Sequence, residues 1–328
     1  MKRWLVLVAM AALTMGADAG PSLNAVVRGD VAKGFSGAVL VTRGDTLLLD
    51  RAYGAGLTPH SRFWIASAGK QFVSAAILKC AERGWLSLDD KLVRFFPDAP
   101  ADKRDITIRQ LLAHMSGLDQ TYASDGTTTR DAAVAAMLSK PMIDKPGAKF
   151  LYSNDNYQLA AAIVEVASGT DYRSFVTRVF FQPLGLRDTG FNFSDGAKRV
   201  APTKAPLPPR LQKPAWGEAG VYSSTHDLFR WYRALQAHRV LRDPSPLFTA
   251  VTPIGEGQAA FNWFLGKTAR GTATIFTRGN DDFGANALIY AYPAKDTVIV
   301  ILTHAGDAND DASWSRFVLK QLGDALNL

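Results

Sequence analysis

The chain has few of the residues and patterns that hold metals or nucleic acids. Cys80 is its single cysteine, which excludes an intramolecular disulfide and a cysteine-based metal site. The histidines are scattered and form no H-E-x-x-H pattern or other ligand pair at helical spacing, so we predict no metal and no other cofactor. The formal net charge is +7, but Lys and Arg form no dense cluster with interleaved aromatics. We therefore expect no nucleic-acid partner.

Long apolar runs are also missing beyond the N-terminus. Lys2 and Arg3 precede an apolar run from Trp4 to Met15, and Ala17-Asp18-Ala19 offers small residues for cleavage. This order is typical of a bacterial secretory signal peptide, and the run is too short for a good membrane span. We expect removal of residues 1–19 and a periplasmic or secreted mature protein without stable membrane insertion. An uncleaved anchor is the alternative.

The composition of the whole chain is that of a soluble globular protein, with 47% hydrophobic and 20% charged residues. Strand signals lie at both ends of the chain, in a hairpin over 37–53 and in four short segments between 261 and 303. Helical signals dominate between them, from 67–83 through 225–237, and a last helix is expected over 312–326. A Pro-rich stretch at 202–214 predicts an ordered surface loop.

These signals predict an α/β (α+β) fold with one antiparallel sheet built from both chain ends and flanked by helices. A mainly helical region is inserted between the two ends. The predicted units are the signal peptide, the sheet domain and the helical insertion, at residues 1–19, 20–85 with 255–328, and 86–254.

The strongest chemical signal is Ser67-Ala68-Gly69-Lys70, just before a long apolar helical run. A serine three residues ahead of a lysine lies on the same face of a helix. At the first turn, that serine lies among backbone N–H groups that have no intrahelical partner. One segment thus offers a nucleophile, a basic amine and part of an oxyanion site. S-x-x-K alone arises by chance in many chains. Whether it marks a catalytic site therefore depends on whether the rest of the sequence supplies the other catalytic residues.

Two further segments offer such partners. Tyr152-Ser153-Asn154 precedes a predicted helix, and a phenol can act as a general base when a neighbouring ammonium lowers its pKa. Asn154 could hold Lys70 and a substrate amide. Arg278-Gly279-Asn280 ends a predicted strand, where a glycine admits a substrate backbone and an arginine can bind a carboxylate. The plainer alternatives are a buried tyrosine beside a helix start and a turn over 279–282.

The three motifs in this order resemble the serine β-lactamase and penicillin-binding superfamily, and the tyrosine is typical of its class C branch. That branch includes D-aminopeptidase, D-alanyl-D-alanine carboxypeptidase and esterase relatives. Four further stretches are similar to family segments: 88–97, 106–118 (L-L-x-H-x-S-G-L), 181–189 and 219–224. The resemblance covers essentially all of residues 30–325.

The resemblance implies that Ser67 is the acylated nucleophile and that Lys70 and Tyr152 pass its proton to the leaving group. It implies that Asn154 orients Lys70 and the substrate, and that the Ser67 N–H and one N–H of the third-motif strand form the oxyanion hole. His114 matches a family position outside the catalytic set, and we interpret it as structural.

The third motif departs from the family pattern of Lys-Thr-Gly, His-Thr-Gly or His-Gly-Gly. Two frames are open: Arg278 at the basic position with Asn280 at the final glycine, or Thr277-Arg278-Gly279, which keeps the glycine. The sequence therefore predicts an exported serine hydrolase that acts on an ester or on an amide or peptide, possibly with a D-residue, rather than an efficient β-lactamase. The alternative is a non-catalytic cell-wall or ligand-binding protein that retains the fold. An α/β-hydrolase is not supported, because no G-x-S-x-G occurs.

Overall fold

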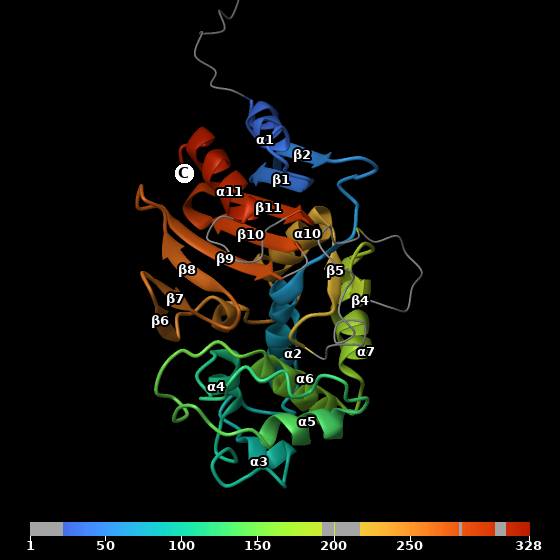
Figure 1. The fold of residues 1–328 in the computed structure, drawn as a ribbon, viewed down its shortest axis with the longest axis vertical. Helices are drawn as coiled ribbons and strands as arrows, with labels where there is room; N and C mark the ends of the chain where they lie inside the picture. The colour runs from blue at the N-terminus through green and yellow to red at the C-terminus, as the bar shows by residue number, and fades with distance from the viewer. Residues whose placement is uncertain (1–21, 192–199, 201–216, 282–283, 306–312) are drawn as a thin grey trace, which may run out of the picture.

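The computed structural model describes residues 22–191, 200, 217–281, 284–305 and 313–328 (Figure 1). The predicted signal peptide at 1–19 and the predicted Pro-rich loop at 202–214 lie outside these ranges. Among the residues that are described, no helix is both long enough and apolar enough to cross a membrane.

The described chain forms an eight-stranded sheet in the order β2-β1-β11-β10-β9-β8-β7-β6, in which all neighbours are antiparallel. The pairing of β1 with β11 joins the two ends of the chain, so the predicted sheet architecture is confirmed. Strands β6 and β7 were not predicted. The bounds are β1 Gly37–Arg43, β2 Thr46–Tyr53, β6 Thr252–Ile254, β7 Gly257–Ala259, β8 Phe264–Lys267, β9 Ala273–Asn280, β10 Asn286–Tyr292 and β11 Thr297–Thr303.

Helices cover both faces of this sheet, which explains why β1 and β11 are apolar on both sides. Helices α1 (Leu23–Val31) and α11 (Trp314–Ala325) lie together on one face, at the top of Figure 1. Val39 and Val41 of β1 point to them, whereas Ala38 and Leu40 belong to the core on the other face. Helix α10 (Thr225–Gln236) contacts β1 and β11 although it lies in the range predicted as the helical insertion. The domain boundaries themselves stay a prediction.

Helix α2 (Lys70–Glu82) runs from the sheet into a mainly helical part and packs against α6 (Asn154–Ser168) (Figure 1). Ten of its residues are buried, as its apolar sequence predicts. The helical chain after α6 is divided into α7, a π-helical turn and α8. The other bounds are α3 Leu92–Phe95, α4 Ile108–Leu112, α5 Arg130–Leu138, α7 Tyr172–Val176, η2 Thr177–Phe181, α8 Gln182–Leu184, η3 Ser245–Leu247 and η4 Pro293–Lys295.

A small second sheet in the order β3-β5-β4 leads into the turn that carries the candidate nucleophile. Its strands are β3 Phe63–Trp64, β4 Gly190–Phe191 and β5 Val221–Ser223. Strand β3 is followed almost directly by the 3-10 turn η1 (Ala66–Gly69). Whatever fixes β3 therefore also fixes this turn.

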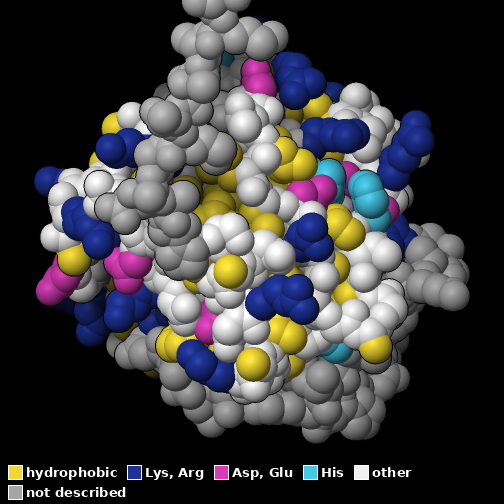
Figure 2. All heavy atoms as spheres, turned by 90° about the horizontal axis from the view of Figure 1, so that it is seen from above, with side chains coloured by type: hydrophobic (Ala, Val, Ile, Leu, Met, Phe, Trp, Pro, Cys, Tyr) yellow, Lys and Arg dark blue, Asp and Glu magenta, His cyan; other side chains and the backbone are white. Residues whose placement is uncertain are grey.

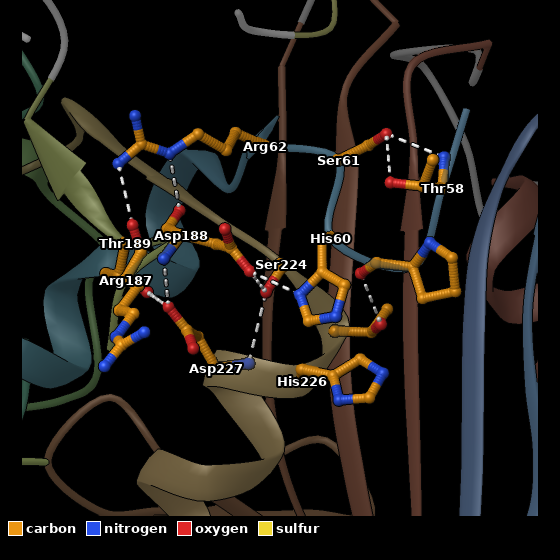
Figure 3. A network of polar contacts seen from close by, with 12 residues as sticks. Thr58, His60, Ser61, Arg62, Arg187, Asp188, Thr189, Ser224, His226 and Asp227 are labelled. Atoms are coloured by element: carbon orange, nitrogen blue, oxygen red, sulfur yellow. Dashed lines mark hydrogen bonds and ion pairs between the residues drawn. The ribbon is translucent and has the colours of Figure 1, made fainter. Parts of the chain in front are cut away.

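A polar network fixes the loop between β2 and β3 (Figure 3). His60 Nδ1 lies 2.8 Å from Asp188 Oδ2, and the His60 ring stacks on His226 with ring centroids 4.7 Å apart. His226 Nε2 in turn lies 2.9 Å from Asp50 Oδ2 on β2. Arg62 donates to the Asp188 carbonyl over 3.0 Å. These contacts tie β2, the 187–189 segment and the start of α10 to the residues that enter β3.

Figure 2 shows how positive charge is distributed on one face of the described chain. On the face seen from the α1 and α11 end, Lys and Arg side chains stand apart among apolar and neutral ones (Figure 2). The described part of that face shows no single basic patch.

Candidate active site

Ser67 lies in the turn η1, whereas the sequence predicted the first turn of the α-helix; α2 itself begins at Lys70. Ala66, the first residue of this turn, has a φ of 45°, which is outside helical geometry. A non-glycine residue at positive φ is costly and is often found at functional sites. The spacing of three residues still places the two side chains together, with Lys70 Nζ 2.9 Å from Ser67 Oγ.

The Lys70 ammonium group is fully buried and has three hydrogen-bond acceptors. Its Nζ donates to Ser67 Oγ at 2.9 Å, to Asn154 Oδ1 at 2.7 Å and to the Glu218 carbonyl at 2.7 Å. Three acceptors match the three N–H bonds of an ammonium, which is how a buried charge is compensated. The predicted contact between Lys70 and Asn154 is therefore present. The Glu218 contribution was missed, because a main-chain carbonyl leaves no side-chain signal in the sequence.

Tyr152 reaches the same serine from the loop before α6. Its Oη lies 2.7 Å from Ser67 Oγ, and its ring centroid lies 5.3 Å from Lys70 Nζ. The hydroxyl of Ser67 is therefore in hydrogen-bond contact with both the phenol and the ammonium. A separation of 2.7 Å between two hydroxyl oxygens is a normal hydrogen bond across which a proton can pass.

His114 packs against the ring of Tyr152 and fixes its position. Its ring stacks on the Tyr152 ring with centroids 4.4 Å apart and planes at 28°, and its Nδ1 accepts the Ser153 N–H over 3.1 Å. The side chain is buried, and burial together with the positive charge of Lys70 holds the pKa of His114 well below its usual value. The imidazole is thus neutral with Nδ1 as the acceptor. Sequence analysis gave His114 a structural role without identifying this contact.

We expect replacement of His114 by Asn to change how stability depends on pH. Because the folded-state pKa of His114 is depressed, the unfolded chain binds a proton below pH 6.5 that the folded chain refuses. Wild-type stability therefore falls as pH falls, and His114 contributes up to about 2 kcal/mol of this loss between pH 7.5 and 5. Asn offers an acceptor oxygen and tolerates the φ of 55° at this position.

The check is urea unfolding of both proteins across this pH range. The free energy of unfolding of wild type, minus that of His114→Asn, should shrink toward pH 5. All other titratable groups are common to both chains, so their contributions cancel to first order. A pH-independent difference would contradict a neutral buried imidazole.

Strand β9 meets the Ser67 turn at Gly279. A Cβ atom on this glycine would lie 2.1 Å from the Ile65 carbonyl oxygen and 2.8 Å from the Ser67 amide nitrogen. Strand β8 pairs only with Ala273–Phe276, so the later residues of β9 extend past β8 beside η1. The glycine of close approach is thus residue 279, which fits the frame Thr277-Arg278-Gly279.

Asn262 is a site residue that sequence analysis missed. Its Nδ2 donates to the Ser67 carbonyl and to Thr277 Oγ1, each over 3.2 Å. It therefore ties the nucleophile turn to β9. Its φ of 60° marks a turn residue, and a single Asn in a turn signals only turn chemistry.

A cavity of about 900 Å³ opens beside these groups. Of the predicted site residues, it is lined by Ser67, Tyr152, Asn154, Arg278 and Asn280. Lys70 lies buried beneath the serine, and Gly279 is buried against the turn. The structure thus brings the three sequence motifs to one place. The described residues contain no group of three or more His, Cys, Asp or Glu that could hold a metal ion.

Comparison with known sequences gives a family match over most of the chain. The sequence model of the family described as Beta-lactamase matches residues 23–322. Protein flp of Staphylococcus aureus (strain COL) is 26% identical over 329 residues, which cover 88% of this chain and 63% of that protein. The chain thus spans less than two thirds of the length of this curated relative.

Two solved structures share the fold. The penicillin binding protein from Bacillus halodurans superposes with a TM-score of 0.78 at 21% identity, covering 94% of this chain and 99% of that one. The D-amino acid amidase from Ochrobactrum anthropi SV3 gives a TM-score of 0.79 at 20% identity, covering 94% and 98%. At these identities the similarity shows the architecture, and the chemistry has to be argued from the site itself.

Proposed function

Because the chain belongs to the β-lactamase family, we propose that it is a serine hydrolase that works through an acyl-enzyme on Ser67. One observation carries the proposal. Ser67 Oγ lies 2.7 Å from Tyr152 Oη and 2.9 Å from Lys70 Nζ, at the wall of a 900 Å³ cavity. A nucleophile in contact with a proton acceptor that is itself oriented by a third group is the arrangement that covalent catalysis requires.

In the proposed reaction, Ser67 Oγ bonds to the carbonyl carbon of the substrate as the Ser67 proton passes to the ionised oxygen of Tyr152, while the Lys70 ammonium keeps its three hydrogens and stabilises the charge beside it. The bond from carbonyl carbon to leaving group then breaks, and the leaving group departs with that proton. A water molecule next attacks the acyl-enzyme, releases a carboxylic acid and restores the Ser67 hydroxyl. Asn154 supports both steps by holding Lys70.

The negative charge that develops on the carbonyl oxygen needs N–H donors. We assign this role to the main-chain N–H groups of Ser67 and Asn280, on the two segments that meet at Gly279. Loss of one such donor typically costs about 3–4 kcal/mol in the transition state. The close approach at Gly279 supports this assignment because it sets the distance between the two segments.

For the substrate, we propose an ester or an amide or peptide, which can include a D-residue. Arg278 is exposed on the cavity wall and can attract a substrate carboxylate there. The fold shared with a D-amino acid amidase supports an amide, and the departure from Lys-Thr-Gly disfavours efficient β-lactam hydrolysis. We further propose that cleavage after residue 19 exports the protein to the periplasm or the medium. N-terminal sequencing of the mature protein tests this.

The proposal is tested by covalent labelling. Incubation with an alkyl fluorophosphonate should add one mass adduct, and peptide mapping should place it on Ser67. Ser67→Ala should take up none, and Ser74→Ala, which removes a buried serine one turn along α2, should be labelled like wild type. Saturable ligand binding without an adduct on wild type would instead favour a non-catalytic binding protein.

A further inference from the structure

Three aromatic rings form a continuous row on the sheet beside the catalytic cavity. Phe264 of β8, Phe276 of β9 and Tyr290 of β10 are directly opposite one another in the strand register. Their ring centroids are 5.4 and 5.0 Å apart, with interplanar angles of 28° and 11°. They are therefore stacked on one another across the three strands, and their edges together form one apolar surface. We call these three residues the aromatic row.

The aromatic row belongs to the same cavity as the nucleophile. All three side chains are half-buried, and all three line the cavity that Ser67 and Tyr152 also line. Aromatic rings that are partly exposed to a cavity offer apolar contact area to whatever occupies it. Stacking among the rings fixes their orientation, so little side-chain entropy is lost when a ligand binds.

The distance along β9 sets the length of a substrate that reaches this row. Phe276, Arg278 and Asn280 project from one face of the strand, opposite to the face on which Gly279 meets the Ser67 turn, so a substrate reaches the row past the edge of β9 that β8 leaves unpaired. Asn280 lies four positions along the strand from Phe276, which corresponds to about 13 Å. A two-carbon acyl group cannot reach from Ser67 to the row, whereas a chain of eight or more carbons approaches it.

The position of Tyr152 decides which part of the substrate points toward the row. The leaving group must receive its proton, so it lies on the side of Ser67 where Tyr152 Oη and Lys70 Nζ are found. In this arrangement the acyl part extends away from Tyr152, along the edge of β9 that β8 leaves unpaired. The two sides of the scissile bond are thus assigned to two sides of the cavity.

We infer that the aromatic row is an acyl-binding subsite that selects esters or amides with a long apolar acyl group. This inference rests on the proposed acyl-enzyme reaction at Ser67. It adds a preference that the catalytic groups alone do not supply, because they contact only the atoms at the carbonyl. The row supplies uniform apolar binding for the far end of the chain, and its effect is expected mainly in KM.

The experiment measures kcat/KM for p-nitrophenyl esters of acetic, butyric, octanoic and decanoic acids. For wild type we expect a rise of about 10-fold or more from acetate to octanoate, in keeping with burial of several methylene groups. Phe276→Ala and Phe264→Ala should each remove most of this rise while turning over the acetate at a near-normal rate. Phe317→Ala, which removes an exposed ring on α11 outside the cavity, is the matched control and should retain the wild-type profile.

The acetate rate also reports whether each variant is folded and catalytically intact. A flat chain-length profile for wild type, or a steep profile that both cavity variants keep, would overturn the subsite. Either result leaves the proposed function standing, provided the acetate is hydrolysed and Ser67 is labelled. No labelling of Ser67 would instead reject the proposed function on which the subsite rests.

Discussion

Tyr152→Phe is expected to lower the rate of Ser67 acylation by about 10²–10⁴-fold, the usual contribution of a general acid–base group. The substitution removes one oxygen, which lies 2.7 Å from Ser67 Oγ. The ring that stacks on His114 stays, so the surrounding structure has no reason to change. The rate can be followed as the burst of p-nitrophenol from p-nitrophenyl acetate, or as the rate of fluorophosphonate labelling.

Tyr122→Phe is the matched control for this experiment. Tyr122 lines the same cavity, and its hydroxyl accepts a hydrogen bond from Gln120 Nε2 over 2.7 Å. Its loss should leave acylation within a few-fold of wild type. If Tyr152→Phe also acylated at a near-normal rate, Lys70 rather than the phenol would have to accept the Ser67 proton.

The sequence was most informative where chemistry depends on local spacing. A spacing of three positions from Ser67 to Lys70 brings their side chains together in a 3-10 turn as well as in an α-helix, so the predicted contact is present although the type of turn was wrong. The hairpin over 37–53 and the helix after residue 70 were likewise predictable. Each depends on short-range periodicity and turn chemistry within one segment.

The features that could not be predicted from the sequence depend on contacts between distant segments. The period of two along β9 places Thr277 and Gly279 on one face, but it does not say which of them meets a turn about 210 residues earlier. Asn262 and the Glu218 carbonyl were missed for the same reason. Both lie in irregular segments, and their contacts with the site come from distant parts of the chain. The short strands β6 and β7 have three residues each, too few for a recognisable alternation.

Because Lys70 is buried, the fold has to supply hydrogen-bond acceptors for its charge. An unpaired ammonium would be strongly destabilising at a fully buried position, and here three oxygens from three separate segments accept its hydrogens. Those segments are the Ser67 turn, the start of α6 and the chain just before β5. Compensating one charge therefore also fixes the relative positions of the nucleophile and Asn154.

Gly279→Ala is expected to disable the site by displacing the turn that carries Ser67. The added Cβ would lie 2.1 Å from the Ile65 carbonyl oxygen, 2.6 Å from the Ala68 nitrogen and 2.8 Å from the Ser67 nitrogen. All three are main-chain atoms, so β9 and the turn must move apart. Overpacking of this kind costs about 1–3 kcal/mol in the free energy of unfolding. A shift of about 1 Å at the reacting atoms costs about 10²-fold in rate.

Gly37→Ala is the matched control, because it should destabilise the protein without displacing the residues of the active site. A Cβ at Gly37 would lie 2.1 Å from the Leu302 carbonyl oxygen, a clash of the same severity between β1 and β11. Both variants should unfold at lower urea concentration than wild type. Only Gly279→Ala should lose acylation rate per folded molecule, because only its clash displaces the Ser67 amide. Equal rates per folded molecule in the two variants would mean that β9 does not position the nucleophile.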